Sequence, residues 1–580
     1  MMARSLICLL LFIFPFHVFA QETDDAAKEK QRHQVVLVNQ ILSDIPTLKL
    51  GENRAYADAK VGNLVWKTDE KLARTLFQSA VGELINAQNL AEADTKNTNY
   101  QYALLNGQNI RPQILTTIAS RDAELALDYL VKTRPANITK ALLNSSVKSS
   151  KIKNSNNNYA NLVQTETNLE QSFIRLAADQ NPERAVKLLK ESLKKGLSEE
   201  TLSLLKKLYA KDAEAANEIA SEIVAKLIQK GFDSQNQNYS QNANVAISFL
   251  SEFIREKNET EKYIKFDSSQ MQTLADKLIS YALQTTNRYG NGYAYSMLPI
   301  AEKLSPGSVA QIKQMQNVNV RRSWGWGGYD PEVTKLLSNG DTTAEMLLGT
   351  AAKVPERSRS QIYQMAANKF AQQGDLNRAT EVLNDNFSDD ALEEMLRNLN
   401  YQYSYNLINA GKFAEAERLI DGFPENTRLS ALINLANAIY QKNPEENKSY
   451  AVSVLGKARS SIAYKPEDSN EMSMLMQIIS AYALIEPSEA FRIFESLTPQ
   501  INELSEAAAI TYGFQKSSNV KGGEFVITNG NSLGVISFDP SIFKKLAEKD
   551  FDRTMNLINS FSRHENQVAL KMQLAEGILN

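Results

Sequence analysis

Residues 375–383 read Asp-Leu-Asn-Arg-Ala-Thr-Glu-Val-Leu, and this short pattern recurs through the chain. It consists of a capping residue, a small residue four positions later, and an apolar pair three and four positions after the small residue. Asp or Asn at the first position accepts hydrogen bonds from the free backbone N–H groups of a first helical turn. The small residue and the apolar pair then lie on one face of the helix. The pattern therefore predicts the start of an amphipathic helix.

Ten copies of the pattern agree on these features. Two of them place proline at the first helical position, Pro182 and Pro487, where its missing N–H has no consequence. Acidic residues follow in the first turn of several copies, where the helix dipole favours them. The small residues are Ala73, Ala126, Ala185, Ala216, Ala246, Ala379, Ala416, Ala451, Ala490 and Thr554, and the capping positions are Asp69, Asp122, Asn181, Asp212, Asn242, Asp375, Lys412, Asn447, Glu486 and Asp550.

A second helical pattern precedes most copies. Residues 362–367 and 429–436 are apolar at 3.6-residue spacing and are followed by a turn containing Gly, Asn or Asp. The repeated unit is therefore helix, short turn, helix. The copies from Ala379 to Ala490 follow one another at 35 to 39 residues. We expect an all-α solenoid of antiparallel helical hairpins.

The chain resembles the tetratricopeptide-repeat superfamily of bacterial α-solenoids. Between residues 363 and 386 the family's small and apolar positions are filled by Ala367, Phe370, Gly374, Leu376, Ala379 and Leu383. Residues 410–416 match the turn into the second helix. The first-helix signature of that family is absent elsewhere, and the spacing between repeats varies. The resemblance extends from about residue 45 to 580 and concerns the architecture alone. It implies an interaction scaffold, because such repeats form concave surfaces for partners. A degenerate helical repeat of another kind has a similar pattern.

The first twenty residues have the features of a secretory signal peptide. Arg4 provides a positive charge, residues 6–16 are almost all apolar, and Val18-Phe19-Ala20 is typical of a cleavage site. We therefore expect export to a periplasm or the extracellular space. The alternative is an uncleaved anchor, although the apolar run is short and contains Pro15. We expect no transmembrane span after signal cleavage.

The composition of the chain excludes several classes of catalytic and metal site. The 580 residues carry a formal charge of −3, which gives no reason to expect nucleic acid as a partner. Cleavage removes Cys8 and His17, leaving no cysteine and only His33 and His564. A cysteine nucleophile or cysteine-bound zinc is then excluded, and no metal or cofactor is expected.

Three segments interrupt the repeats. Residues 144–161 and 233–244 are rich in Asn, Ser or Lys and are interpreted as polar loops. Residues 519–540 contain two β-prone runs, 524–528 and 534–538, and predict a small β-hairpin insert. The expected organisation is a flexible segment at 21–35, N-terminal repeats at 36–318, a Trp/Gly-rich loop at 319–331, and C-terminal repeats at 332–580.

The candidate binding residues lie in the Trp/Gly-rich loop. They are Arg321, Arg322, Trp324, Trp326 and Tyr329. Exposed aromatic rings stack on sugars or peptide side chains, and arginines pair with carboxylates. The alternative is that both tryptophans fill an irregular joint between two stretches of repeats.

Three functional hypotheses follow from these features. The first is an exported, non-catalytic scaffold that binds a protein or peptide partner. The second is a carbohydrate-active enzyme on an (α/α) toroid, in which an acid pair including Asp330 would act beside the tryptophans. The third is a module that binds a glycan or peptide without turnover.

Overall fold

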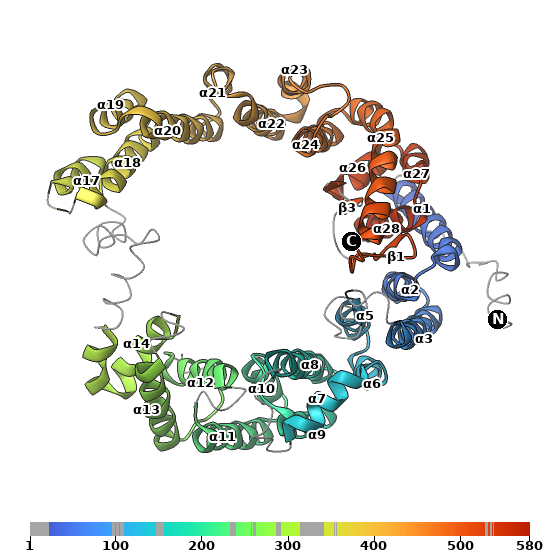
Figure 1. The fold of residues 1–580 in the computed structure, drawn as a ribbon, viewed down its shortest axis with the longest axis vertical. Helices are drawn as coiled ribbons and strands as arrows, with labels where there is room; N and C mark the ends of the chain where they lie inside the picture. Colours follow the sequence, from blue (N-terminus) through green and yellow to red (C-terminus); the bar gives the residue numbers. More distant parts are fainter. Residues whose placement is uncertain are drawn as a thin grey trace. The chain divides into compact units, whose positions relative to one another are not determined.

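The computed structural model describes residues 23–94, 99, 104, 110–146, 156–232, 239–256, 258, 263–285, 292–313, 342–352, 354, 356–527, 532–533, 536–537 and 539–579. Helices dominate the described part, as the sequence predicts (Figure 1). They form two compact units. Unit 1 consists of residues 1–39, 326–511 and 529–580, and unit 2 of residues 40–325 and 512–528.

Each unit is built from two rows of helices, a first-helix row and a second-helix row, in which each helix packs against its neighbours (Figure 1). In unit 2 the first-helix row is α2 (Gly51–Val65), α5 (Ile110–Ala119), α8 (Asn156–Ala177), α10 (Thr201–Tyr209), α12 (Tyr239–Ile254) and α14 (Gly292–Leu304). The second-helix row is α3 (Glu70–Ala93), α6 (Ala123–Lys132), α9 (Pro182–Lys195), α11 (Ala213–Lys230) and α13 (Ser268–Thr285), with the additional helices α7 (Ala136–Ser146), η1 (Ile45–Thr47) and η2 (Pro306–Ser308).

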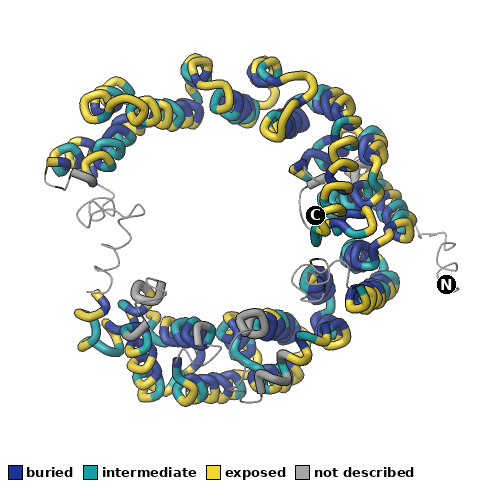
Figure 2. The backbone as a smooth tube through the Cα atoms, in the orientation of Figure 1, coloured by how far each residue is buried: buried dark blue, intermediate teal, exposed yellow. Residues whose placement is uncertain are grey.

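Unit 1 repeats this arrangement. Its first-helix row is α18 (Glu356–Gln372), α20 (Asp389–Asn409), α22 (Glu425–Lys442), α24 (Ser469–Ile485), α26 (Ser541–Lys549) and α28 (His564–Leu579). Its second-helix row is α17 (Ala344–Ala351), α19 (Leu376–Asn386), α21 (Phe413–Asp421), α23 (Pro444–Ser460), α25 (Pro487–Phe514) and α27 (Phe551–Asn559). Helix α1 (Thr23–Asp44) begins in unit 1, where His33 stacks on Phe551 at 3.9 Å. Figure 2 shows that buried positions gather where the two rows face each other.

The predicted capping residues begin most of the second-row helices. At six of the ten positions the side chain accepts a hydrogen bond from the backbone N–H three residues later, as an N-cap does. These residues are Asp69, Asp122, Asn181, Asp212, Asp375 and Asp550. The small residue four positions later is fully buried in each of these helices. The pattern therefore encodes both the helix start and its packed face.

Four predicted copies differ from the structure. Glu486 directly precedes α25, but its carboxylate pairs with Lys448 at 2.9 Å and accepts no cap bond from the described residues. Asn242 lies inside α12, because that helix already begins at Tyr239. Asn447 lies one turn inside α23, whose cap is Asn443 followed by Pro444. Lys412 begins α21 without a side-chain cap, since an ammonium group cannot accept a hydrogen bond.

The turn before α19 shows how a hairpin closes within two residues. Gly374 has a φ of +90°, and its N–H donates to the carbonyl of Ala371, while the N–H of Asp375 donates to the carbonyl of Phe370. This pair of bonds is a Schellman motif, which ends α18. Asp375 then caps α19, so one residue closes one helix and opens the next. Ala367, Phe370, Ala379 and Leu383 pack together in the core beneath this turn.

The interpretations of the interrupting segments are partly wrong. Residues 144–146 end α7, residues 156–161 begin α8, and residues 239–244 begin α12, because Asn, Ser and Lys lower helix propensity by only about 0.7 kcal/mol per residue or less. Residues 147–155 and 233–238 lie outside the described part.

The β-insert is confirmed, but its pairing differs from the predicted single hairpin. Strand β1 (Val520–Lys521) pairs with β2 (Glu524–Phe525), and β3 (Ser532–Leu533) pairs with β4 (Ile536–Ser537). Gly522 and Gly523 both have positive φ, as a two-residue type I′ turn requires, and this turn selects the first pairing.

A buried ion cluster joins three helices of unit 2. Arg111 on α5 and Glu166 on α8 are each 1% exposed, and Arg111 donates two hydrogen bonds to the Glu166 carboxylate at 2.7 and 3.1 Å. Arg134, in the turn between α6 and α7, donates a third at 2.6 Å. Burial alone would raise the pKa of Glu166, but Arg111 and Arg134 together hold this pKa below its ordinary value. The carboxylate therefore contributes to stability while it is ionised.

We expect Asp375→Ala to lower the free energy of unfolding of unit 1 by about 1 kcal/mol, because the first turn of α19 loses its cap. Lys412→Ala is the matched control, since Lys412 occupies the same position in the next hairpin without a cap bond. Its effect should stay within about 0.5 kcal/mol. Urea unfolding followed by circular dichroism measures both, and equal losses would contradict the role given to the cap.

We expect Glu166→Gln to destabilise unit 2 by about 3–5 kcal/mol at pH 7, because the buried guanidinium group of Arg111 and the partly buried one of Arg134 lose their counter-charge. The folded-state pKa of Glu166 lies below the unfolded value of about 4.3. The contribution of this carboxylate is therefore complete above the unfolded pKa and disappears as the pH falls through the folded pKa.

The control is Glu200→Gln, which removes a half-exposed bridge to Arg175 and should change stability by less than about 1 kcal/mol. Unfolding free energies measured from pH 7 to pH 3 compare the two variants. If the loss of unfolding free energy caused by Glu166→Gln did not depend on pH, the role given to the ionised carboxylate would be contradicted.

Candidate functional site

The residues singled out from the sequence cannot be placed. The five candidate binding residues lie within 314–341, outside the described residues; they are Arg321, Arg322, Trp324, Trp326 and Tyr329. The proposed signal peptide at 1–20 also lies outside the described residues. Within the described part, no group of three or more His, Cys, Asp or Glu side chains is arranged to hold a metal ion. Helices long and apolar enough to span a membrane are likewise not found among those described.

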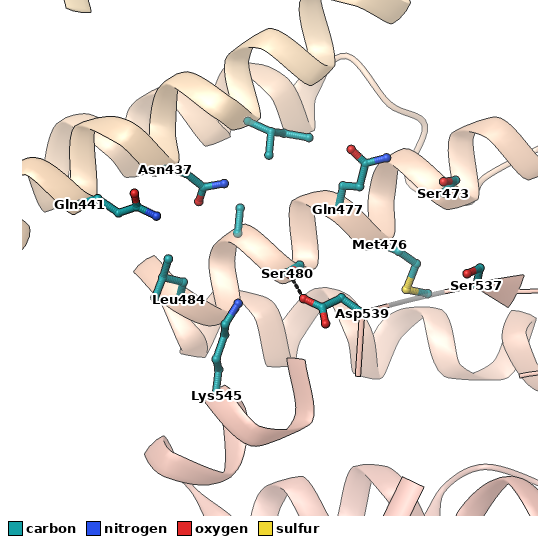
Figure 3. Close-up of a pocket in the computed structure, with 12 residues that line it drawn as sticks. Asn437, Gln441, Ser473, Met476, Gln477, Ser480, Leu484, Ser537, Asp539 and Lys545 are labelled. Carbon is teal, nitrogen blue, oxygen red and sulfur yellow. Dashed lines mark hydrogen bonds between the residues drawn. The ribbon is translucent and has the colours of Figure 1, made fainter. Parts of the chain in front are cut away.

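A pocket in the first-helix row of unit 1 is the candidate site. It has a volume of about 500 Å3, within the usual range of ligand pockets. Figure 3 shows side chains from α22, α24 and α26 around one space, with Ser537 and Asp539 on one side of it. The lining residues are Ile433, Asn437 and Gln441 of α22, Ser473, Met476, Gln477, Ser480, Ala481 and Leu484 of α24, Ser537 of β4, Asp539, and Lys545 of α26.

Helical spacing brings the polar lining together. Asn437 and Gln441 are four residues apart on α22, and Ser473, Gln477 and Ser480 follow the same spacing on α24. Residues three and four apart share one helix face, so each helix presents a polar stripe to the pocket. Because α22 and α24 pack side by side in the first-helix row, the two stripes face the same space.

The floor of the pocket is apolar and well packed. Ile433 and Met476 are 6% and 3% exposed, and Ala481 is also buried. Leu484 is partly exposed beside them. The site therefore offers an apolar surface surrounded by polar groups, an arrangement typical of ligand-binding pockets.

Asp539 is held in place by serines. Its carboxylate accepts hydrogen bonds from the Ser541 hydroxyl at 2.5 Å, from the Ser541 backbone N–H at 2.9 Å, and from the Ser480 hydroxyl at 3.4 Å. Partial burial by itself would raise the pKa of Asp539, but these donors and the charge of Lys545 hold that pKa below its ordinary value. Asp539 therefore stays ionised at neutral pH and faces the positive charge of Lys545.

The other polar groups keep their hydrogen-bonding capacity. Within the described part of the chain, Asn437, Gln441, Gln477 and Lys545 form no hydrogen bond with another protein group. The carbonyl oxygen of Asn437 is inaccessible to solvent and has no partner. A buried polar atom without a partner destabilises a fold by about 1–3 kcal/mol.

The polar surface continues onto the next first-row helix. Asn434, on α22, donates to the hydroxyl of Tyr405 on α20 at 3.1 Å. Tyr405 is 40% exposed and lies edge-on to Tyr401, with ring centroids 5.7 Å apart. Amide and hydroxyl groups therefore extend from α20 across α22 to α24.

The sequence alone does not indicate this site. Asn, Gln and Ser on a helix are ordinary residues of a solvated face, and no catalytic motif accompanies them. Their spacing was visible in the sequence, but the capacity of these groups to bind a ligand depends on the packing of three helices and an insert.

Comparisons with known proteins do not assign the chain to a family. No family model matches it, and none of the curated proteins does. A solved structure described as a circular tandem repeat protein with novel repeat topology and enhanced subunit contact surfaces aligns with 91% of this chain and 98% of its own. The identity is 14% and the TM-score 0.18, so this likeness carries no argument.

We expect Asn437→Leu to leave the free energy of unfolding unchanged or to raise it by about 1 kcal/mol, because it removes an unsatisfied carbonyl of similar size. Asn443→Leu is the control on the next helix. It removes the cap of α23 and should lower stability by about 1 kcal/mol. Chemical denaturation of unit 1 in the full chain compares them, and a loss above about 1 kcal/mol for Asn437→Leu would show that the residue serves the fold.

Proposed function

We propose that this protein is an exported, non-catalytic helical-repeat scaffold that binds an extended segment of a partner protein in the pocket between α22, α24 and α26. The observation that carries the proposal is the set of unused amide groups at Asn437, Gln441 and Gln477. The repeat architecture supports it, because stacked hairpins present continuous surfaces to partners. Export is supported by the leader-like residues 1–20.

The chemistry of the lining favours a peptide. A side-chain amide carries a donor and an acceptor side by side, and each residue of a peptide backbone offers the same pair of groups. Asn437 on one helix and Gln477 on the next therefore suit a backbone that runs between them. The apolar floor at Met476 and Leu484 suits an aliphatic side chain of that segment.

The rival carbohydrate and enzyme readings find less support in this pocket. Sugar sites generally include an aromatic ring for stacking, and none is found among the described residues that line the pocket. Glycoside hydrolysis requires two carboxyl groups, whereas Asp539 supplies the one carboxylate of that described lining. The Trp324 and Trp326 segment stays a second candidate site, for a glycan as well as for a protein.

Affinity recovery of the mature protein from its native envelope tests the proposal. We expect a specific partner with the wild-type chain, and at least a tenfold loss of recovery with the Asn437→Ala, Gln477→Ala double variant. The matched control is Asn377→Ala, Asn556→Ala, which changes two exposed amides on second-row helices and should retain the partner.

The other outcomes are distinguishable. A partner lost only with Trp324→Ala, Trp326→Ala would move the site to the Trp/Gly-rich loop. Recovery of no partner by any variant would contradict the scaffold role, and hydrolysis across a panel of cell-wall polysaccharides would establish the enzyme instead.

A further inference from the structure

The start of helix α2 in unit 2 has no cap of its own. Leu50 occupies the N-cap position, and an aliphatic side chain cannot accept a hydrogen bond from the first turn. Glu524 of strand β2, which is 474 residues away in the sequence, instead accepts a hydrogen bond from the backbone N–H of Leu50 itself, at the N-cap position. We call Lys49, Leu50 and Asn53 the α2 cap site, and residues 519–527 the capping hairpin.

The α2 cap site and the capping hairpin fit each other closely. Glu524 is 4% exposed and Asn53 is fully buried. The Glu524 carboxylate accepts hydrogen bonds from the backbone N–H groups of Lys49 and Leu50 at 2.7 and 3.1 Å and from the Asn53 side-chain amide at 2.7 Å. Asn53 also donates to the carbonyl of Phe525 and accepts from the N–H of Ile527, both at 2.7 Å. A carboxylate at a helix N-terminus is further stabilised by the helix dipole.

The capping hairpin depends on this site for its own structure. Each of its strands is two residues long, and such a ribbon is not stable alone in water. Val520, Phe525 and Ile527 are buried in unit 2. At the rim, the Lys521 ammonium lies 3.4 Å from the Asp94 carboxylate at the end of α3. The hairpin and the site are therefore two complementary parts of one interface.

We propose that the α2 cap site is also an exchange site, at which the capping hairpin of a second copy of this chain replaces the chain's own. Every copy carries both the site and the hairpin. Two copies can therefore exchange hairpins reciprocally and close into a symmetric dimer without any new contact. The proposal is independent of the pocket on unit 1.

The long sequence separation makes exchange competitive during folding. A short flexible linker gives an effective concentration in the millimolar range, which falls roughly as the −3/2 power of length. For a span of 474 residues whose repeats have not yet folded, the effective concentration is on the order of micromolar. A second copy present at tens of micromolar then competes with the chain's own hairpin.

Zero-length crosslinking of the full-length mature chain tests the proposal. Equal amounts of light and 15N-labelled protein are unfolded together and refolded at about 0.5 and about 50 µM, on either side of the micromolar estimate. A carbodiimide then joins Lys521 to Asp94, and mass spectrometry separates the isotopic species of the crosslinked peptide. We expect mixed light–heavy crosslinks, with a dimer by light scattering, at the higher concentration alone.

Two results would overturn the proposal. The first is an absence of mixed crosslinks at both concentrations, a measurement that needs no variant. The second uses Glu524→Ala, which should reduce the mixed crosslink at least tenfold, beside the exposed control Glu548→Ala, which should not change it. A dimer that persists in Glu524→Ala after the mixed crosslink is lost would arise from another surface.

Discussion

The first turn of every helix exposes backbone N–H groups that have no acceptor within the helix, and the way this chain satisfies them organises the molecule. Asp or Asn caps fix where second-row helices begin, and the small residue four positions later fixes which face packs inward. In unit 2 a related requirement reaches across the chain, because the backbone N–H groups of Lys49 and Leu50, directly before α2, donate to Glu524. Hydrogen bonding at helix starts thus defines the repeat and also a contact between distant parts of the sequence.

Buried polar groups elsewhere in the chain show what a purely structural role looks like. Gln171 is fully buried on α8, and its carbonyl accepts hydrogen bonds from the hydroxyls of Ser198 and Thr201 at 2.6 and 2.8 Å. Arg111 likewise has partners for each of its nitrogen atoms. Asn437 contrasts with both, since its buried carbonyl is left without a partner beside three further uncommitted side chains. The physical reason for the binding surface proposed on unit 1 is that four polar side chains without a hydrogen bond among the described residues line one pocket there.

The sequence predicted those features that depend on near neighbours. Asp69, Asp375 and Asp550 could be recognised as caps because the cap, the small residue and the apolar pair all lie within nine residues. The prediction that Asn242 is a cap was wrong, because α12 begins three residues earlier. In the sequence, a cap-like residue inside a helix looks the same as a true cap. The predicted strand pairing of the insert was wrong, because the Gly522-Gly523 turn determines which strands pair more strongly than the apolar runs do.

Contacts between segments that are distant in the sequence could not be predicted from neighbouring residues. Nothing near Glu524 indicates that its acceptor oxygens serve Lys49 and Leu50, and nothing near Asn437 indicates that Gln477 will face it. Both depend on which helices become neighbours in the folded chain. Composition gave no indication of the pocket.

The most direct measurement of the central claim is site-specific photo-crosslinking from position 477 in the native envelope, with the same photoreactive amino acid at position 377 as a control on the second-helix row. We expect one partner crosslinked from position 477, through a contiguous peptide of that partner, and none from position 377. Crosslinks from position 377 alone, or an identical pattern from both positions, would contradict the assignment of the binding surface to the pocket between α22, α24 and α26.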